Sequence, residues 1–134
     1  MKLALILGML ALSAGPALAQ GDVVAGEAKA RVCQACHAIG EGAGTKVGPQ
    51  LNGTIGRPIA GLADYDYSAV LSEAGESGMV WTTDNLRRYL RRPKKMFPGT
   101  KMSFYGIRDP QDLDNVIAYL ASFAPDGTRV EPPR

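Results

Sequence analysis

The sequence is poor in the side chains from which most catalytic and metal sites are built. Its 134 residues contain one histidine, two cysteines and one tryptophan. A tetrahedral zinc site made of several cysteine and histidine ligands is therefore excluded. The length is also short, because a domain takes roughly 150 residues. A multidomain enzyme is excluded, and we expect one domain.

The longest apolar run is short and lies at the N-terminus. Met1-Lys2 gives a basic start, residues 3–12 are almost wholly apolar, and Ala17-Leu18-Ala19 has the small-x-small pattern of a cleavage site. These features are typical of a secretory signal peptide, cleaved after Ala19. An uncleaved membrane anchor is the alternative, but polar and helix-breaking residues within 13–16 interrupt the run short of the ~20 residues that a spanning helix needs.

An excess of charge of one sign is absent as well. Cleavage removes one basic residue, Lys2, and leaves 14 basic against 13 acidic residues. Such a balance predicts no nucleic-acid partner. We expect a periplasmic protein with a domain at 20–127, a flexible tail at 128–134 and no stable membrane insertion. In that oxidising compartment two nearby thiols would usually form a disulfide.

The two cysteines stand in the segment Cys33-Gln34-Ala35-Cys36-His37. Two thiols three residues apart, followed directly by a histidine, are the spacing of c-type haem attachment. On one helical turn both sulfurs can form thioether bonds to one porphyrin edge, and the adjacent imidazole can take the iron. A disulfide and a thioredoxin-like redox pair are the alternatives, but the latter belongs to a strand-to-helix junction that this sequence does not predict. The motif predicts one haem c bound through Cys33 and Cys36, with His37 as an axial ligand.

Helix signals recur along the rest of the chain, and no alternating strand pattern is found. Capping residues at Asp22, Thr82 and Asp109 each precede an apolar stripe, and a weaker helix is expected at 68–74. The second of these helices should stop at Pro93. The third should bury Leu113, Val116, Ile117, Leu120 and Ala124. Residues 38–58 hold too many glycines for a helix and predict an irregular loop.

The order of these motifs, from Gly21 to Ala124, resembles the class I c-type cytochromes, the family of mitochondrial cytochrome c and its bacterial periplasmic relatives. The resemblance implies a small all-α fold in which the N- and C-terminal helices cross and loops wrap one covalently bound haem. Gly26 would let the first helix approach the last one near Tyr119. Ala30 and Val32 depart from residues common in the family, which implies a looser contact between the two helices. Leu71 lies where the family has an asparagine near the axial tyrosine, which implies a different hydrogen-bond network there.

The resemblance also implies roles around the haem. Gly48-Pro49 is similar to the family's proline, whose carbonyl accepts the imidazole N–H, and Gly56-Arg57 to its arginine step near a propionate. The other matches are Tyr67 and Trp81 as propionate donors, Tyr89 as the tyrosine behind the axial methionine, and Pro98-Gly99-Thr100-Lys101-Met102 as the methionine loop. Tyr67 and Trp81 could equally be buried aromatics with other partners.

The sixth iron ligand is sought among the methionines, because no second histidine exists. The mature chain offers Met79, Met96 and Met102. Met102 lies in a Pro-Gly loop beyond a helix stop, where the backbone can reach across the ring, and the resemblance points to the same residue. Met96 is the alternative, and Met79 is expected to pack beside Trp81.

Histidine and thioether ligands together fill both axial positions of the iron. A filled site favours one-electron transfer, and the chain has no spare histidine and no paired nucleophile and base for catalysis. The sequence therefore predicts a soluble periplasmic electron carrier between respiratory or photosynthetic partners, not an enzyme. The alternatives are a cytochrome subunit or acceptor of a periplasmic dehydrogenase and, less favoured, an open-site haem enzyme or sensor.

Half of the mature basic residues lie between Arg87 and Lys101. Lys94, Lys95 and Lys101, with Arg91 and Arg92, bracket the methionine loop and resemble the family's lysine ring. They predict docking of a monomeric carrier onto redox partners with acidic surfaces. A solvated helix face is the alternative interpretation of the same residues.

Overall fold

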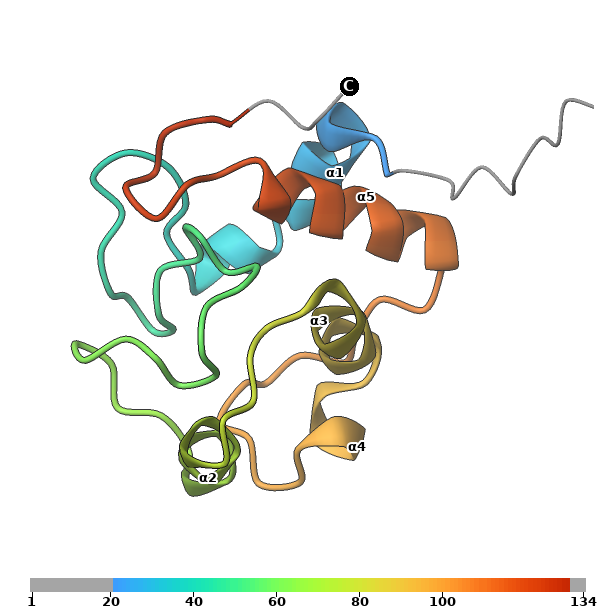
Figure 1. Cartoon of the computed structure of the whole chain (residues 1–134). Coiled ribbons are helices and arrows are strands. Elements are labelled where there is room, and N and C mark those ends of the chain that lie inside the picture. The colour runs from blue at the N-terminus through green and yellow to red at the C-terminus, as the bar shows by residue number, and fades with distance from the viewer. Residues whose placement is uncertain (1–20, 131–134) are drawn as a thin grey trace, which may run out of the picture.

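The computed structural model describes residues 21–130, and its regular structure is helical. The predicted signal peptide with its cleavage site at Ala19, and residues 131–134, lie outside the described residues. In chain order the elements are α1 (Val23–Ala30), the 3-10 helix η1 (Cys33–Ala35), α2 (Ala69–Glu76), α3 (Thr83–Arg91), α4 (Pro93–Met96) and α5 (Pro110–Ala121) (Figure 1). Within residues 21–130, pairing of the β type is limited to two isolated bridges, Pro58 with Val80 and Phe123 with Arg129. The predicted all-α fold is confirmed.

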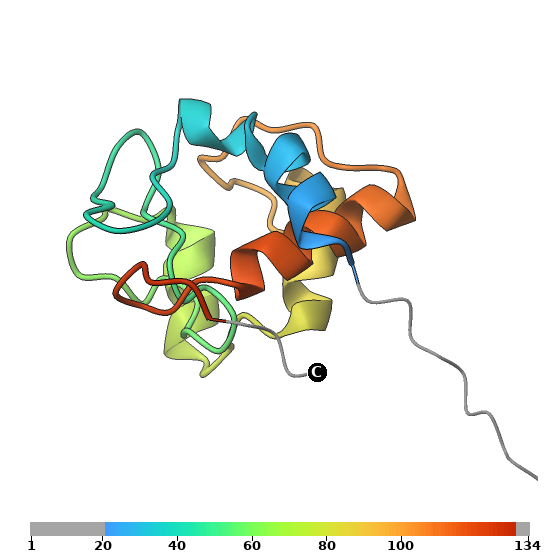
Figure 2. The ribbon, with the colours of Figure 1, turned by 90° about the horizontal axis from the view of Figure 1, so that it is seen from above.

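The N- and C-terminal helices pack against each other, and α1 lies across α5 when the molecule is seen from above (Figure 2). Side chains at both N-caps hold the first turns: Asp22 accepts from the Ala25 N–H at 2.7 Å, and Asp109 from the Asp112 N–H at 2.9 Å. Gly26 is buried at the crossing, where an added Cβ would overlap the Asn115 carbonyl. The absence of a side chain at Gly26 lets the two helices approach this closely.

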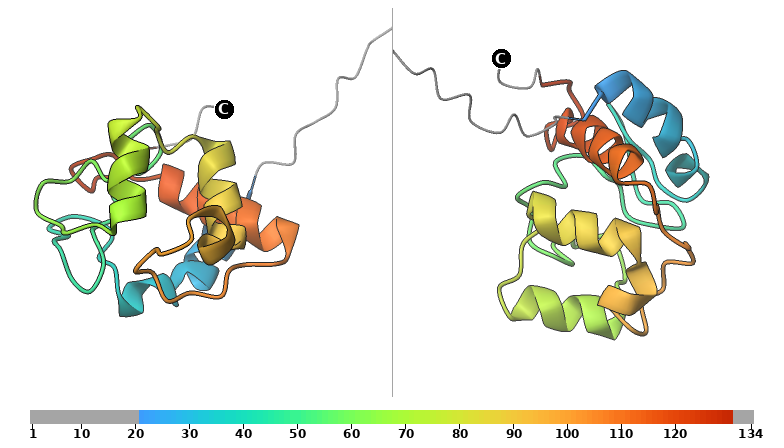
Figure 3. Two further views of the ribbon diagram at one scale, coloured as in Figure 1. Left: turned by 90° about the horizontal axis from the view of Figure 1, so that it is seen from below. Right: turned by 90° about the vertical axis from the view of Figure 1, so that its right-hand side faces the viewer.

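Helix α3 connects the crossed pair to the rest of the molecule. It packs against α5 on one side and α4 on the other, and Figure 3 (right) shows it between α5 and α2. The Thr82 hydroxyl caps it by accepting from the Asn85 N–H at 3.0 Å. Its apolar face is buried, as expected, through Leu86, Tyr89 and Leu90. Pro93 does end this helix, but it also starts α4, because proline fits the first position of a helix.

Helix α5 ends earlier than predicted, and it buries more residues than the predicted apolar stripe. It stops at Ala121, so Ala124 lies beyond the helix. In addition to the predicted apolar stripe it buries Asn115 and Tyr119, which face α1. The Asn115 side chain accepts from the Asp22 N–H at 2.8 Å and so joins the two helices.

The segment after α5 folds back onto the end of that helix. The Ala124 N–H donates to the Thr128 carbonyl at 2.9 Å, and the Val130 N–H to the Ser122 carbonyl at 2.9 Å. The Arg129 guanidinium lies over the Phe123 ring, 4.4 Å from its centroid. These contacts attach residues 128–130 to α5, and the rest of the tail predicted at 128–134 lies outside the described residues.

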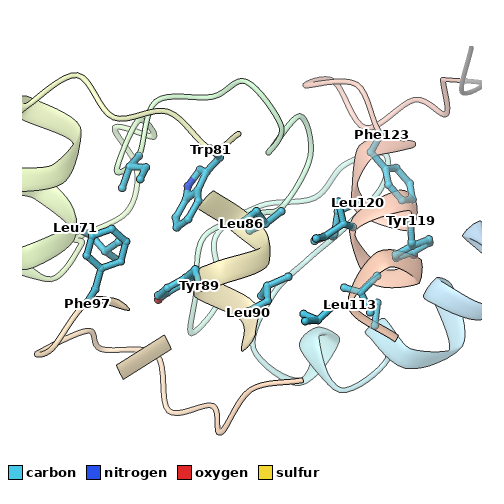
Figure 4. Close-up of a cluster of buried hydrophobic side chains, with 14 of the residues drawn as sticks. Leu71, Trp81, Leu86, Tyr89, Leu90, Phe97, Leu113, Tyr119, Leu120 and Phe123 are labelled. Carbon is cyan, nitrogen blue, oxygen red and sulfur yellow. The ribbon is translucent and has the colours of Figure 1, made fainter. Parts of the chain in front are cut away.

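The core runs from the crossed helices to the far end of α3 (Figure 4). Its α5 part contains Leu113, Val116, Ile117, Tyr119, Leu120 and Phe123. Its other part gathers Trp81, Tyr89 and Phe97 with Leu71 of α2. Between η1 and α2 the chain forms loops without a helix, as the glycine content of 38–58 predicts.

Candidate haem-binding site

The Cys-His motif forms a single tight turn. Cys33 starts the 3-10 helix η1, and its carbonyl accepts from the N–H groups of Cys36 at 3.1 Å and His37 at 2.8 Å. Both cysteines are free thiols, half-buried at Cys33 and exposed at Cys36. Burial raises the pKa of the Cys33 thiol. The turn keeps two unpaired thiols and one imidazole adjacent, which suits double attachment to one ligand and does not form the alternative disulfide.

The His37 ring is oriented by the glycine-rich loop that follows it. Its Nδ1 donates to the Pro49 carbonyl at 2.6 Å, so its Nε2 is left as the free ligand atom. Burial lowers the pKa of His37, and the nearby charges of Lys46 and Arg57 lower it further, whereas the Pro49 carbonyl raises it. The imidazole is therefore held neutral, the form that binds a metal ion.

Gly48 packs directly against the His37 ring. A Cβ added at Gly48 would overlap the His37 ring, because it would lie only 2.7 Å from the His37 Nδ1 and 2.9 Å from the His37 Nε2. The Gly48 N–H donates to the Cys36 carbonyl at 2.8 Å, which fixes the loop to the Cys-His turn. Glycine at 48 is needed because any side chain would displace the ring from Pro49.

Arg57 and Trp81 are brought side by side by their own backbones. The Trp81 N–H donates to the Arg57 carbonyl at 2.9 Å, and the Gly56 N–H donates to the Trp81 carbonyl at 2.8 Å. The Arg57 guanidinium donates through Nη1 to the Asn52 carbonyl at 3.0 Å and through Nη2 to the Gln50 carbonyl at 3.2 Å. Its Nε is buried without a partner among the described residues. One donor of a half-buried cation is therefore available to an anionic group.

Tyr67 and Ser68 stand where the long loop enters α2. Burial raises the pKa of Tyr67, and the Arg57 charge lowers it, which places the two side chains within electrostatic reach. The Ser68 side chain is buried, and its Oγ has no hydrogen-bond partner within residues 21–130. Sequence reasoning missed Ser68 because a serine before a helix is an ordinary cap, yet this hydroxyl makes no capping bond.

Three residues of the methionine side form a connected group. The Tyr89 hydroxyl and the Thr100 Oγ1 are hydrogen-bonded at 2.8 Å. The Met102 N–H donates to the same Thr100 oxygen at a longer 3.4 Å. Thr100 therefore joins the buried face of α3 to the loop that carries Met102. Burial raises the pKa of Tyr89, and the bond to Thr100 lowers it.

Aromatic side chains line the region beside this loop. The Trp81 and Tyr89 rings are 5.1 Å apart between centroids, and Phe97 lies edge-on to Trp81 at 6.5 Å. Figure 4 shows these rings together with Leu71, separate from the side chains of α5. Such a surface is apolar, with Tyr89 contributing a bonded hydroxyl.

The three candidate methionines are all partly buried against the core. Met79 lies where α2 ends, and its N–H donates to the Ala74 carbonyl at 3.1 Å. Met96 is the last residue of α4. Met102 is placed by a loop, held through Thr100. Met102 therefore lies in a loop, whereas Met96 lies in a helix.

The residues present fit a haem. Two free thiols and a neutral imidazole lie on one turn. The aromatic rings and Met102 belong to one apolar cluster. The buried Arg57 Nε and Ser68 Oγ have no partner among the described residues and could donate to carboxylates. A ligand set of this kind needs no cluster of acidic residues. Among residues 21–130, no group of three or more His, Cys, Asp or Glu side chains could hold a metal ion by itself. No helix in that range is long and apolar enough to cross a membrane.

Comparison with known proteins gives consistent matches over most of the chain. The family model "Cytochrome c" matches residues 23–124. The cytochrome c2 of Agrobacterium tumefaciens (strain II Chrys) is 57% identical over 101 residues, 75% of this chain and 91% of that protein. Two solved structures are also similar. Cytochrome c2 from Rhodospirillum centenum has a TM-score of 0.72 and 37% identity, covering 78% of this chain and 100% of that one. Cytochrome cH from Methylobacterium extorquens has a TM-score of 0.67 and 41% identity, covering 75% and 98%.

Proposed function

The chain belongs to the cytochrome c family, and on that premise we propose that His37 and Met102 are the axial ligands of a haem c that Cys33 and Cys36 bind covalently. Members of this family are electron-transfer proteins. The protein is accordingly a haem c electron carrier with redox proteins as partners, and it is not an enzyme. When bound, the haem iron supplies a one-electron couple.

The hydrogen bond between His37 Nδ1 and the Pro49 carbonyl supports the proposal most directly. It fixes the ring and leaves Nε2 free, while burial lowers the pKa of His37 and keeps the imidazole neutral. Because Gly48 packs on the ring, His37 cannot turn away when the iron changes its charge. A ligand held in one orientation keeps the reorganisation small, which favours rapid electron transfer.

Loop geometry supports Met102 over Met96 as the second ligand. Thr100 connects the Met102 backbone to the Tyr89 hydroxyl, so the loop is fixed relative to α3. Arg57 Nε and Ser68 Oγ would bind the haem carboxylates, with Tyr67 and Trp81 beside them. Arg57 forms no salt bridge with a carboxylate within residues 21–130, so in this arrangement the haem carboxylates would be its ion-pair partners.

The oxidised visible spectrum of the purified holo-protein tests the ligation. A weak band at about 695 nm reports sulfur bound to ferric haem iron. We expect the band in the parent protein and in Met96→Ala, and its loss in Met102→Ala. Loss in Met96→Ala alone would transfer the ligand role to Met96. Absence of the band from the parent protein would refute methionine ligation and favour a haem enzyme or sensor.

We further propose that the partner docks on the basic surface that includes Lys94 and Lys95 with Arg91 and Arg92. All four side chains are exposed. Lys101 is a weaker candidate, because its Nζ is paired with the Asp66 carboxylate at 2.9 Å. The carrier would work as a monomer. Association rates with a purified acidic redox partner should fall as ionic strength rises, and rates that stay constant would contradict this docking.

We propose the periplasm as the location, on the strength of the N-terminal pattern. Cleavage after Ala19 gives a mature chain that begins at Gln20. Mass spectrometry of the protein from a periplasmic extract tests both points. A chain that retains residues 1–19, or that stays in the membrane fraction, would contradict them.

A further inference from the structure

Asn52 is a buried polar side chain in the loop that follows the Cys-His turn, with 4% of its surface exposed. Both ends of its amide bind the backbone of one residue, Gly40. The Asn52 Oδ1 accepts from the Gly40 N–H at 2.8 Å, and the Asn52 Nδ2 donates to the Gly40 carbonyl at 2.8 Å. The side chain therefore joins two parts of the loop that are 12 residues apart.

This contact is the last in a series that holds two arms of the loop, residues 36–40 and 48–52, side by side. The other bonds of the series are Gly48 N–H to the Cys36 carbonyl at 2.8 Å, His37 Nδ1 to the Pro49 carbonyl at 2.6 Å, and Leu51 N–H to the Ala38 carbonyl at 3.0 Å. The bonds follow one another in the same order along both arms. The Pro49 carbonyl is therefore held against His37 by bonds on either side of it, and Asn52 supplies the bonds at the far end.

Residues 123–127, which follow α5, pack over this end of the two arms. A Cβ added at Gly53 would lie 2.8 Å from the Pro125 Cγ, and one added at Gly127 would overlap the Gly40 carbonyl. Figures 1 and 2 both show the red segment after α5 beside the teal loop. The covering segment therefore contacts the residues on both sides of the amide contact, which explains how a loop side chain is buried.

The backbone of Asn52 is connected to the other half of the site. Its carbonyl accepts from the Arg57 Nη1 at 3.0 Å, and the Gln50 carbonyl accepts from the Arg57 Nη2 at 3.2 Å. These bonds orient the guanidinium whose buried Nε has no partner among the described residues. A displacement of Asn52 would thus disturb Arg57 as well as the arm that carries Pro49.

We propose that Asn52 is a positioning residue of the redox site, which orients His37 through Pro49 and Arg57 through its own carbonyl, and that residues 123–127 keep it in place. The inference rests on the proposed ligand role of His37. It adds a residue that acts only through its neighbours. An imidazole and a guanidinium held in fixed positions move little when the iron changes its charge, which favours rapid electron transfer.

A general contribution to stability is the alternative role for a buried asparagine, and Asn115 provides the matched control. Asn115 is also buried, at 7% exposure, and its side chain also binds the backbone of a distant segment, where it accepts from the Asp22 N–H at 2.8 Å. It lies on α5 and faces α1, apart from the two arms. Alanine at either position deprives a backbone group of its partner. Both variants should lose stability, but only Asn52→Ala should loosen His37 and Arg57.

The test measures hydrogen exchange by NMR in the reduced, haem-loaded protein labelled with ¹⁵N. The His37 Nδ1–H and the Arg57 Nε–H report on the site, and the backbone amides of α5 report on the helices. In Asn52→Ala we expect both site protons to exchange about tenfold faster, because the local opening loses the bonds to Gly40. In Asn115→Ala the α5 amides should exchange faster, and the two site protons should change by about twofold or less.

Electron self-exchange connects this loosening with the reaction. It is measured from NMR line broadening in mixtures of the reduced and oxidised protein. Because both substitutions replace an uncharged side chain by another, neither changes the charge that the two molecules bring together. Self-exchange should therefore be slower in Asn52→Ala than in the parent, and Asn115→Ala should match the parent.

A second variant acts on the covering segment and leaves the Asn52 side chain in place. Pro125→Ala removes the ring atoms that lie closest to Gly53. It should raise the exchange rates of the same two site protons, by less than Asn52→Ala does. Because this change is small, it tests the proposal even if Asn52→Ala fails to take up haem.

Different results would overturn different parts of the inference. Equal effects of Asn52→Ala and Asn115→Ala on the His37 proton would show that Asn52 only stabilises the fold. Faster exchange at His37 without a change at Arg57 would refute the coupling between them. Unchanged rates in Pro125→Ala would remove residues 123–127 from the proposal. Failure of the proposed function would be distinct, because the His37 ring of the parent protein would then give the signals of an unbound imidazole.

Discussion

The crossing of α1 and α5 makes Gly26→Ala a sharp test of the fold. Gly26 is buried, and an added Cβ would overlap the Asn115 carbonyl and lie 2.9 Å from the Tyr119 Cβ. The nearest atoms belong to the α5 backbone, which cannot rotate away as a flexible side chain can. The two helices must therefore separate to accommodate one methyl group.

Two effects of opposite sign determine how much Gly26→Ala changes the free energy of unfolding. Alanine favours the helix over glycine by about 1 kcal/mol. Overpacking a buried contact costs about 1–3 kcal/mol, and the backbone position of Asn115 places this case at the upper end. The free energy of unfolding should therefore fall by about 2 kcal/mol. Propensity alone predicts a gain, so the sign of the change is itself informative.

Guanidinium unfolding of the holo-protein, followed by far-UV circular dichroism, measures this change. The matched control is Ala28→Gly, an exposed position of the same helix, which should lose about 1 kcal/mol through propensity alone. A Gly26→Ala protein as stable as the parent, with the control behaving as expected, would refute the close contact between α1 and α5.

The remaining predictions concern two further contacts. Tyr89→Phe removes the 2.8 Å bond to Thr100 and should lower the free energy of unfolding by about 1 kcal/mol, measured by denaturant titration and absent in a Thr100→Val background. Burial raises the pKa of Tyr89 in the folded protein. The neutral phenol therefore contributes its full share to the free energy of unfolding below the unfolded pKa of about 10, and this share is lost as the pH rises through the folded pKa. Tyr89→Phe should accordingly lose less stability than the parent protein at alkaline pH. Arg129→Ala removes the cation over the Phe123 and Tyr119 rings and should cost about 1 kcal/mol by the same titration; no loss would mean that residues 128–130 are not attached to α5.

Helix starts were predictable because each depends on local chemistry. Asp22, Thr82 and Asp109 all accept a backbone N–H three residues later, as the sequence pattern predicts. Helix α4 was missed for an equally local reason. Proline signals both the end of one helix and the first position of another, and Pro93 does both.

Contacts distant in sequence were harder to predict. The stripe of α5 identified the face toward the core, but Asn115 is buried by α1, which lies about ninety residues earlier in the chain. The approach of α1 near Tyr119 came only from the resemblance. No residue spacing within α5 reports such a neighbour. The contacts of residues 128–130 were missed in the same way, since they depend on where Ser122 and Phe123 lie after folding.

For the site, the Cys-His spacing predicts the attachment turn from chemistry alone, whereas the partners of that turn came from the resemblance. The contact between His37 and Pro49 is found where the resemblance implies. The resemblance gave Tyr89 and Thr100 separately, and their hydrogen bond is seen only in the structure. Ser68 had no signal beyond its place before a helix. Its role depends on an unpaired buried hydroxyl, which only the folded structure reveals.

Stability and the redox site are carried by different parts of the chain. The close contact at Gly26 holds α1 against α5, whereas the residues proposed to bind the haem, His37, Arg57 and Met102, all lie outside helices. Loops can hold ligands firmly here because their backbones are bonded to neighbouring segments, as at Pro49 and Thr100. The variants should therefore separate: Gly26→Ala should lower the free energy of unfolding and keep the band at about 695 nm. Met102→Ala should lose the band and retain the contact between α1 and α5. A Gly26→Ala protein without the band would show that the crossed helices also determine the position of the methionine loop.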